Sequence, residues 1–506
     1  MFLQLPTLRT RGGRIRVLSV WLAMFVRGAL NGPANADTFI VREDDGKQAK
    51  VDARLAGEGQ GCVALEKPDG RIEIVPQDQI LKRIPGPDPD PITREEMLQR
   101  LTERFGKEKF RGYAEQNYVI GMVLAESLPK KLDKTATELL KKGAKFMRLV
   151  DKEFLKFVDD LKVDLVKPRY PLVVLIFETD DDFIAYTEAE TGGRGLTAGN
   201  MLGYYSGLSN HLVIRMSECH TFETPLHEAI HQQVYNRGVL QRLSAAPAWF
   251  NEGIATGFEG NGERINAGPL TVNLRYARPA INAKIVDWDD VVADDKAFRG
   301  DVLAGEAYAH AWSIHWFLVT KYRKQYMKYL QLLSQKKPLE KDDDKTRIKE
   351  FEEIFGKSVG KLQAEFPEAL RQAALKMDLK PTPRKPPGYL LAQSNLAEVE
   401  LNVANTENSG PAAEGRMRNM SLLRPMSFLV TVETNAGTYA EWYLPNVAPR
   451  HAPINMDREL ITKRMVNGPG GPSSSFGVRV RAVVADSPTD QQWKRGNMPV
   501  PTFRGD

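Results

Sequence analysis

Hydrophobic residues recur at helical spacing over several long stretches of this chain. Between Lys131 and Leu161 apolar side chains return every three or four residues, which predicts a long amphipathic helix. The same periodicity predicts one helix from Glu306 to about Gln335. A further helix is expected from Arg347 to about Leu375, with a break near Gly356. The middle of the chain is therefore expected to be largely helical.

Apolar runs between these helices predict β-strands. Residues 171–177 (PLVVLIF) are continuously apolar, which is typical of a strand buried on both faces of a sheet. Residues 210–216 (NHLVIRM) predict another strand. Two shorter helices are expected after it, from 221 to about 236 and from 248 to about 258. Strands and helices within one segment indicate the α+β fold class.

The two ends of the chain differ from this middle part. Between 37 and 85, short strands separated by Asp-Gly turns predict a small β-barrel-like module. Alternating apolar residues predict a β-rich accessory module at 389–506. Proline-rich segments at 86–91 and 380–388 predict linkers, which leaves 92–379 as the central domain.

The first 36 residues have the features of a secretory signal peptide. Several arginines precede a short apolar run, Val17 to Val26, and Ala34-Asn35-Ala36 matches a cleavage site. The run is far shorter than the roughly 20 residues of a membrane-spanning helix. We therefore expect a secreted, periplasmic or cell-envelope protein with no transmembrane span in the mature chain. An uncleaved anchor is the alternative.

Removing this segment changes the charge balance of the chain. The whole sequence holds 70 Lys and Arg residues against 65 Asp and Glu. Five arginines and no acidic residue lie in 1–36, so the mature chain holds 65 of each sign. A formally neutral chain gives no electrostatic support for nucleic-acid binding. Cys62 and Cys219 are too few for a disulfide framework and are expected to be free thiols.

The most specific chemistry in the sequence lies at His227 to His231 (HEAIH). An HExxH run on a helix places both imidazoles on one face, one turn apart, where they bind the same metal ion. Glu228 then lies beside the metal and can take a proton from a bound water. A catalytic zinc site needs three protein ligands. Glu252, in the second short helix, is the best third ligand, and Gly253 after it allows two helices to pack closely.

On these residues the chain resembles the gluzincin zinc metallopeptidases, in which a glutamate on a second helix completes HExxH. More closely, it is similar to the peptidase MA-like group and to the related DUF1570 proteins of planctomycete-type bacteria. The shared motifs are GYYS (203–206), LHEAIHQ (226–232), PAWFNEGIATGFE (247–259) and YAHAWSIHWFL (308–318). The resemblance covers about 110–370. It implies that 92–379 is a zincin-like metallopeptidase core, built from a mixed sheet and active-site helices.

The resemblance also implies a role for each site residue. His227, His231 and Glu252 would bind Zn²⁺, and Glu228 would act as general base and later as proton donor. The strand at 210–216 would be a sheet edge that pairs with the backbone of a peptide or protein substrate. The oligomeric state is left open.

Two features of the site remain open in the sequence. Thr256 occupies the position at which many gluzincins carry an aspartate that orients a zinc-bound histidine; Glu259 or a backbone carbonyl is the alternative partner. Tyr308 is the first choice for stabilising an oxyanion, because many gluzincins use a tyrosine or histidine from a later helix. A packed core tyrosine is an equal alternative for Tyr308. His310 and His315 lie on different helix faces, and His315 is expected to be a core histidine.

These features lead to an exported zinc-dependent peptidase that hydrolyses peptide bonds with Glu228 as general base. One alternative is a catalytically inactive, zinc-bearing envelope protein that binds or scaffolds partners. Another is hydrolysis of a different amide or an ester by the same site, because an activated water does not by itself select the acyl substrate. Bound zinc without cleavage in a broad peptide screen would favour the inactive alternative.

Overall fold

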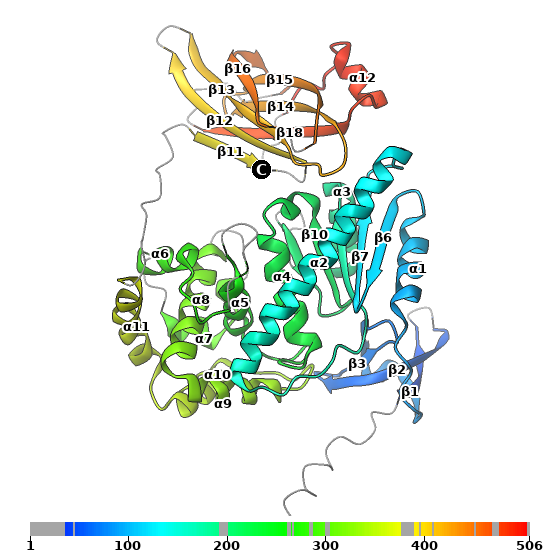
Figure 1. Cartoon of the computed structure of the whole chain (residues 1–506), viewed down its shortest axis with the longest axis vertical. Helices are drawn as coiled ribbons and strands as arrows, with labels where there is room; N and C mark the ends of the chain where they lie inside the picture. Colours follow the sequence, from blue (N-terminus) through cyan, green and yellow to red (C-terminus); the bar gives the residue numbers. More distant parts are fainter. Residues whose placement is uncertain are drawn as a thin grey trace, which may run out of the picture.

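The chain has a mixed α+β architecture, seen in a computed structural model in which the described strands form four sheets (Figure 1). The predicted signal, 1–36, lies outside the described residues except for Ala36, and the predicted linker at 380–388 lies wholly outside them. No helix in the described part is both long and apolar enough to cross a membrane. The structure describes residues 36–502 apart from 44–45, 192–200, 261–264, 266–267, 283–286, 299–303, 376–388, 394–395, 407–408, 450–451 and 468–474.

An antiparallel sheet of order β4-β3-β2-β1-β5 forms the N-terminal part. Its elements are β1 (Ala36–Arg42), β2 (Gln48–Gly59), β3 (Cys62–Glu66), β4 (Ile72–Pro76), the 3₁₀ helix η1 (Gln77–Gln79) and β5 (Ile80–Ile84). Arg242 of the central part, only 9% exposed, donates to the Glu66 carboxylate and to the carbonyl oxygens of Gly70 and Gly207. Arg242 therefore links the N-terminal sheet to the loop that contains Gly207.

A five-stranded mixed sheet of order β6-β7-β8-β10-β9 forms the centre of the molecule. Strands β7, β8 and β10 are parallel, and β6 and β9 run antiparallel at the two edges. The strands are β6 (Phe110–Glu115), β7 (Tyr118–Val123), β8 (Leu172–Phe177), β9 (Gly203–Tyr205) and β10 (His211–Arg215). The prediction that 210–216 forms an edge is wrong, because the three-residue β9 pairs outside β10.

Strand β8 is buried on both faces, as its continuously apolar sequence predicts. Leu172, Val174 and Ile176 join the larger core, which includes side chains of α2 (Lys130–Leu161) and α4 (Glu223–Asn236). The alternate residues of β8 join a second core with α1 (Arg94–Phe105) and α3 (Asp180–Thr191). Figure 1 shows the long α2 crossing the sheet diagonally. The helix that carries the HExxH run therefore lies on the α2 face.

The remaining helices of the central part are the 3₁₀ helices η3 (Met216–His220) and η4 (Lys296–Phe298), and α5 (Ala248–Phe258), α6 (Leu274–Asn282), α7 (Trp288–Ala293), α8 (Ala304–Lys321), α9 (Arg323–Ser334), α10 (Asp344–Phe355) and α11 (Val359–Ala374). Helix α5 packs against both α4 and α8, and most of the others pack around α8. The predicted break at Gly356 is confirmed, since this residue ends α10 with a φ of 68°.

The single helix expected from Glu306 to Gln335 is two helices. Tyr322 takes φ −125° and ψ 37°, outside the helical region, and separates α8 from α9. Its hydroxyl group donates to Glu365 and accepts from Lys357, which fixes the turn against α11. The apolar periodicity continues through both helices, so periodicity alone did not reveal the break.

Two four-stranded sheets, β11-β12-β13-β16 and β17-β15-β14-β18, face each other in the C-terminal part. Met417, Phe428, Val430 and other apolar side chains of both sheets form its separate core. The elements are β11 (Tyr389–Gln393), β12 (Ala397–Thr406), β13 (Gly410–Asn419), β14 (Met426–Thr434), β15 (Thr438–Val447), β16 (Ile454–Leu460), β17 (Lys463–Arg464), β18 (Phe476–Val484) and α12 (Pro488–Lys494).

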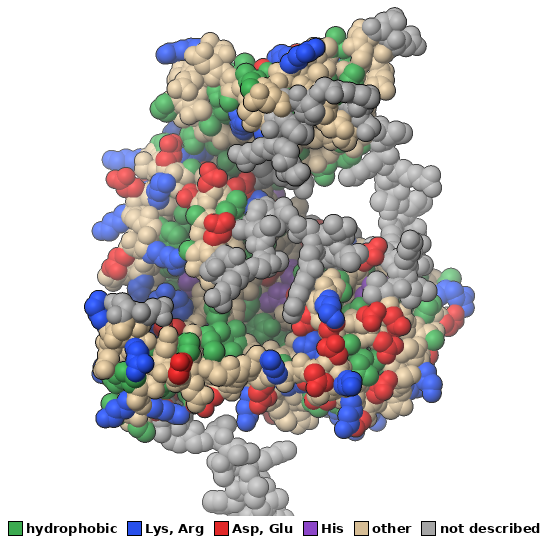
Figure 2. All heavy atoms as spheres, turned by 180° about the vertical axis from the view of Figure 1, so that it is seen from behind, with side chains coloured by type: hydrophobic (Ala, Val, Ile, Leu, Met, Phe, Trp, Pro, Cys, Tyr) green, Lys and Arg blue, Asp and Glu red, His purple; other side chains and the backbone are tan. Residues whose placement is uncertain are grey.

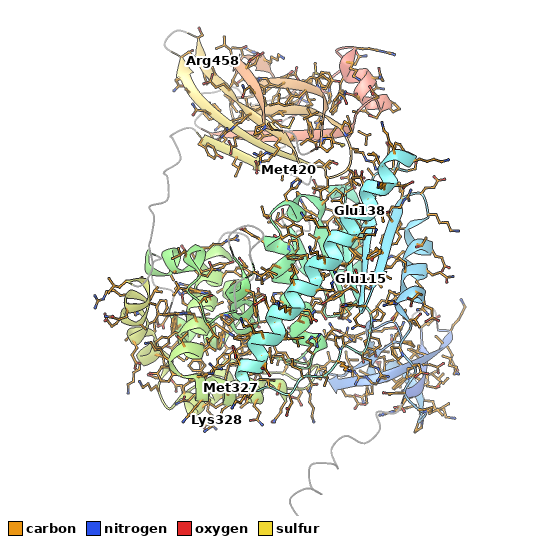
Figure 3. The ribbon with its side chains drawn as sticks, in the orientation of Figure 1. Glu115, Glu138, Met327, Lys328, Met420 and Arg458 are labelled. Atoms are coloured by element: carbon orange, nitrogen blue, oxygen red, sulfur yellow. The ribbon has the colours of Figure 1, made fainter. Side chains whose placement is uncertain are left out.

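The loop between β13 and β14 joins this C-terminal sandwich to the central part. Leu422 and Leu423 belong to the core that contains α2 and α4. Arg424, 3% exposed, donates to both carboxylate oxygens of Glu178 at 2.8 and 3.0 Å. Met420, labelled in Figure 3, lies at this border, and its carbonyl oxygen is 2.8 Å from His220 Nε2. The junction is therefore both apolar and ionic.

Candidate metal centre

Helix α4 presents two imidazoles to one point in space. Residues four apart lie on the same helix face, and the rings of His227 and His231 are 4.7 Å apart. Their Nε2 atoms approach to 3.0 Å. Both residues are buried, at 8% and 5% exposure. This helix therefore delivers two nitrogen donors into a sheltered position. In the space-filling view of the opposite face (Figure 2), histidine side chains are visible in a hollow below the C-terminal sandwich.

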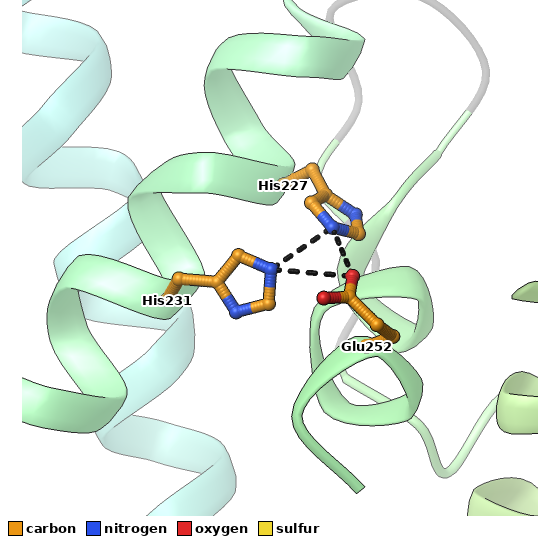
Figure 4. Close-up of side chains that lie close together, drawn as sticks. All are labelled: His227, His231 and Glu252. Carbon is orange, nitrogen blue, oxygen red and sulfur yellow. Dashed lines mark hydrogen bonds and ion pairs between the residues drawn. The ribbon is translucent and has the colours of Figure 1, made fainter. Parts of the chain in front are cut away.

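Helix α5 brings the third donor to the same point (Figure 4). Glu252 Oε2 lies 2.9 Å from Nε2 of His227 and 3.4 Å from Nε2 of His231. The boundaries predicted for this helix, 248–258, match the structure. Trp249 and Phe250 are fully buried and pack the helix onto the core, as expected. The three residues proposed from sequence as metal ligands are therefore brought together.

Close packing of α5 against α8 sets the position of Glu252. A Cβ atom added at Gly253 would lie 2.5 Å from the Ala311 carbonyl oxygen and 2.9 Å from the Cβ of His315. We expect Gly253→Ala to lower the free energy of unfolding by about 1–3 kcal/mol, because backbone atoms must move to admit the methyl group. Urea unfolding measures this change.

The matched control for that substitution is Gly360→Ala in α11. There the added Cβ would have the Asp289 carboxylate as its nearest neighbour, at an ordinary 3.5 Å. Alanine favours the helix over glycine by about 0.5–1 kcal/mol, so this variant should be as stable as the wild type or more so. Equal unfolding curves for the two variants would contradict the packing argument.

The outward nitrogen of each histidine has its own hydrogen-bond acceptor. His227 Nδ1 lies 2.8 Å from Glu259 Oε1, and His231 Nδ1 lies 3.2 Å from Asn251 Oδ1. A carboxylate and an amide oxygen only accept, so both Nδ1 atoms carry the proton. Each Nε2 of the neutral rings then points its lone pair inward. Of the two partners left open for this role, the structure has Glu259 rather than a carbonyl.

Glu259 is itself held by two side chains of the α6 region. Tyr276 donates its hydroxyl hydrogen to Oε2 of Glu259 at 2.7 Å, and Arg275 donates to the same oxygen at 3.2 Å. Thr256, where an aspartate was expected, is fully buried and donates to the carbonyl oxygen of Gly253 instead. Asn251, Arg275 and Tyr276 are contributors that the sequence reasoning missed. Only Asn251 had a local signal, since it directly precedes the ligand glutamate.

The donor set fits a small divalent cation. Two neutral imidazole nitrogens and a carboxylate oxygen converge with lone pairs facing one another, at 2.9 to 3.4 Å. Such an arrangement is repulsive unless a cation or a proton lies between the atoms. Ligands of a tetrahedral zinc site, about 2.0–2.1 Å from the ion, are about 3.3 Å apart. Their fixed Nδ1 partners orient both rings for such an ion.

The histidines and carboxylates of the cluster shift each other's pKa values. Burial opposes a charge on His227, but hydrogen bonds to Glu252 and Glu259 and the nearby Glu228 raise its pKa well above the usual value. Burial also opposes a charge on Glu252, yet His231 and His227 lower the pKa of this carboxyl group far below its usual range. The site therefore attracts positive charge strongly.

Glu228 faces the edge of the central sheet. Its Oε2 accepts a hydrogen bond of 2.8 Å from the backbone N–H of Tyr205 in β9. Ser206 and Leu202 form backbone hydrogen bonds with β10. The N–H of Ser206 donates to the carbonyl oxygen of His211, and the N–H of Arg215 donates to that of Leu202. Strand residues alternate in direction, so the backbone groups of Gly203 and Tyr205 point away from β10. The outer side of β9 therefore lies beside Glu228.

Tyr308 lies next to the three converging donors. Its ring centroid is 5.8 Å from that of His227, in an edge-to-face arrangement. The charge of Glu252 and then burial raise the pKa of its hydroxyl group far above the usual value, which keeps it protonated. Tyr308 thus lies beside His227, and it also packs against the core.

Other residues singled out from sequence lie away from the donors. His315 is fully buried, and its Nε2 lies 2.7 Å from the Tyr326 hydroxyl oxygen, which confirms a core histidine. Tyr204 donates to Glu190 at 2.7 Å, among side chains of the α3 face. His220 bonds the C-terminal part through Met420. Cys62 and Cys219 are not joined in a disulfide bond.

The Glu259 contact leads to a prediction about metal affinity. In Glu259→Gln the amide oxygen still accepts from His227, but the negative charge is lost. We expect zinc affinity to fall about 10- to 100-fold, the usual cost of losing an outer partner of a metal-bound histidine. Competition with a chromogenic chelator measures it. Glu223→Gln is the control, because Glu223 also binds Arg275 but not the histidines; equal losses in both variants would contradict the assignment.

Part of the chain is similar to a known protein family. Residues 222–340 match the family described as a protein of unknown function (DUF1570). The matched segment contains the three converging donors, Glu228 and Tyr308, and it agrees with the resemblance found in the motifs. That description assigns no activity. A search of curated proteins finds no match.

Proposed function

We propose that this chain is an exported zinc-dependent peptidase with a zincin-like central domain. The convergence of two imidazole nitrogens and a carboxylate oxygen, each histidine held through its outward nitrogen, carries the proposal. Glu228, Tyr308 and the outer edge of β9 lie close to these donors. They would serve as general base, oxyanion donor and substrate-binding edge. The mixed sheet with α4 and α5 on one face is consistent with a zincin-like core.

The zinc ion would be held by His227, His231 and Glu252. When bound, it supplies a Lewis acid that lowers the pKa of water toward neutrality and polarises a substrate carbonyl. Glu259 and Asn251 hold the two rings in the tautomer whose Nε2 lone pairs face inward. The ligands are therefore preorganised by the chain itself.

Glu228 would take the proton of the attacking water. The N–H of Tyr205 holds one carboxylate oxygen of Glu228 at 2.8 Å, and this leaves the other oxygen to accept the proton. The same carboxyl group would then donate the proton to the amine that leaves when the peptide bond breaks. One residue thus serves as base and acid in turn.

Tyr308 would donate its hydroxyl hydrogen to the developing oxyanion. Its position beside His227 and its raised pKa suit a neutral donor that stays protonated at the pH of the reaction. Donors placed where negative charge develops stabilise the transition state more than the ground state.

The outer side of β9 would bind the backbone of the substrate. The backbone groups of Gly203 and the carbonyl oxygen of Tyr205 point away from β10, so an extended peptide could add to the sheet there and run beside Glu228, which the Tyr205 N–H holds. This edge takes the place of 210–216 in the expected substrate contact.

Mass-spectrometric profiling of cleaved peptides tests this function. A peptide library is incubated with the wild type and with Glu228→Gln, each loaded with zinc and each analysed for metal content. The proposal expects cleavage only by the wild type. Equal zinc in both proteins with no cleavage by either would instead support an inactive zinc-bearing binding protein. If the protein hydrolysed only esters or other amides, its substrate class would be one of these and not peptides.

A further inference from the structure

A second polar site lies on the other face of the central sheet. Leu212 and Ile214 of β10 join the core with α2 and α4, and Val213 joins the core with α1 and α3. Side chains alternate along a strand, so His211 points to the same face as Val213. This face is opposite to the metal helix, which makes the second site independent of the metal centre and of the proposed peptidase activity.

A cavity of about 260 Å³ opens at this place. Its walls come from three elements: the turn between β3 and β4, helix α1 and the start of β10. A water molecule occupies about 30 Å³ in the liquid, so the cavity admits an ion of several heavy atoms. The polar residues that line it are Asp69, Arg71, Arg100, Glu103, Arg104 and His211.

Positive charge exceeds negative charge in this cavity. Three guanidinium groups face two carboxylates. Asp69 is shared by Arg71 at 2.7 Å and Arg100 at 3.4 Å. Arg104 stacks over the ring of Tyr186 at 4.5 Å and forms no ion pair with any described carboxylate. The lining therefore retains an arginine that can neutralise an anion.

The buried His211 has a ring nitrogen without a partner. It is 4% exposed, and its Nδ1 lies 2.9 Å from the Tyr186 hydroxyl oxygen. Its Nε2 has no hydrogen-bond partner among the described residues. In the tautomer in which the Tyr186 hydroxyl donates to Nδ1, the ring proton is on Nε2. Burial and the charges of Arg104 and Arg71 lower the pKa of His211 to about 3, so the ring is neutral.

We infer that this cavity binds a phosphate-class oxyanion, either free phosphate or the phosphate group of a larger molecule. Guanidinium groups match such oxygens with paired N–H donors. In the tautomer that carries its proton on Nε2, the buried N–H of His211 gains an acceptor when the anion is present, and an unpaired buried polar atom is costly. Donors from three elements need more acceptor atoms than the two oxygens of a carboxylate provide. The half-exposed Arg71 and Arg100 leave the cavity open to solvent.

Titration with inorganic phosphate tests this site. Calorimetry and thermal unfolding are performed on the full chain at constant ionic strength. The wild type is expected to bind, and Arg104→Gln to bind about 10- to 100-fold more weakly, as for loss of one hydrogen bond to a charged group. Arg94→Gln, on the same helix but outside the cavity, is the control and should bind as the wild type does. A phosphomonoester such as glycerol 3-phosphate distinguishes a free ion from a phosphate group on a larger molecule.

Two further measurements show whether phosphate binds in this cavity and not elsewhere on the protein. In ¹⁵N-histidine spectra the Nε2–H signal of His211, assigned by its absence in His211→Gln, should shift when phosphate is added. His231→Ala should bind phosphate like the wild type, since it alters only the metal centre. Phosphate binding that is unchanged in Arg104→Gln, or that leaves the His211 signal unmoved, would overturn the inference.

Discussion

Replacing Glu228 with glutamine is expected to remove hydrolysis while zinc stays bound. Glutamine has nearly the same shape, and its Oε1 can still accept from the Tyr205 N–H, so the local structure should persist. An amide cannot take the proton of water. General acid–base groups contribute about 10²–10⁴-fold to turnover, and we expect kcat to fall by about 10²-fold or more.

Steady-state hydrolysis of the best library peptide and zinc analysis of the same preparation measure both halves of this result. Glu223→Gln is the matched control, because Glu223 begins the same helix and contacts Arg275 rather than the three donors. It should retain zinc and turnover. If Glu228→Gln cleaved peptides at the wild-type rate, Glu228 would not be the base and the proposed mechanism would fail.

Removing one histidine of the cluster is expected to remove the metal. In His231→Ala the three converging donors become two, and a catalytic zinc site needs three protein ligands. Zinc content should fall from about one ion per chain to nearly none, and peptide cleavage should stop. A ligand present at 100 times its dissociation constant stabilises the fold by about 2.7 kcal/mol. The zinc-dependent rise in melting temperature seen with the wild type should therefore be absent.

The control for this loss is a histidine outside the cluster. His220 lies in η3, close to the same helix in sequence, but its Nε2 contacts the carbonyl oxygen of Met420. His220→Ala should keep its zinc, even if the junction with the C-terminal sandwich is weakened. Treating the wild type with a chelator should reproduce the state of His231→Ala. Full zinc content in His231→Ala would show that the cluster is not the metal site.

Elements with strong local signals could be predicted from the sequence. The hydroxyl of Thr93 accepts from the backbone N–H of Glu96, and the Glu96 carboxylate accepts from that of Thr93, so the TREE sequence at 93–96 forms a capping box at the start of α1. Helix α5 follows Pro247 and has the predicted bounds. The HExxH spacing placed His227 and His231 on one face, because helix geometry alone determines that relation. These features depend on neighbours within a few positions.

Features that depend on distant packing could not be predicted in this way. Strand β9 has only three residues, too few for an alternating pattern to appear, so the sequence does not reveal that it covers the edge of β10. The acceptor Asn251 lies in α5 and the donors Arg275 and Tyr276 lie in α6, two segments that meet at the histidines only in the folded chain. Side-chain hydrogen bonds of this kind leave no period in the sequence.

The shortness of β9 has a consequence for self-association. A long, flat edge strand recruits other copies of the same chain, and very short edges are one way in which proteins prevent this. With three residues, and with the Tyr205 N–H already bonded to Glu228, β9 offers little to a second copy. The shortness of β9 also limits the number of backbone hydrogen bonds that it can form with any extended peptide. Selectivity among peptides must then depend on side chains that surround the three converging donors. Substitution of those side chains is therefore expected to alter selectivity.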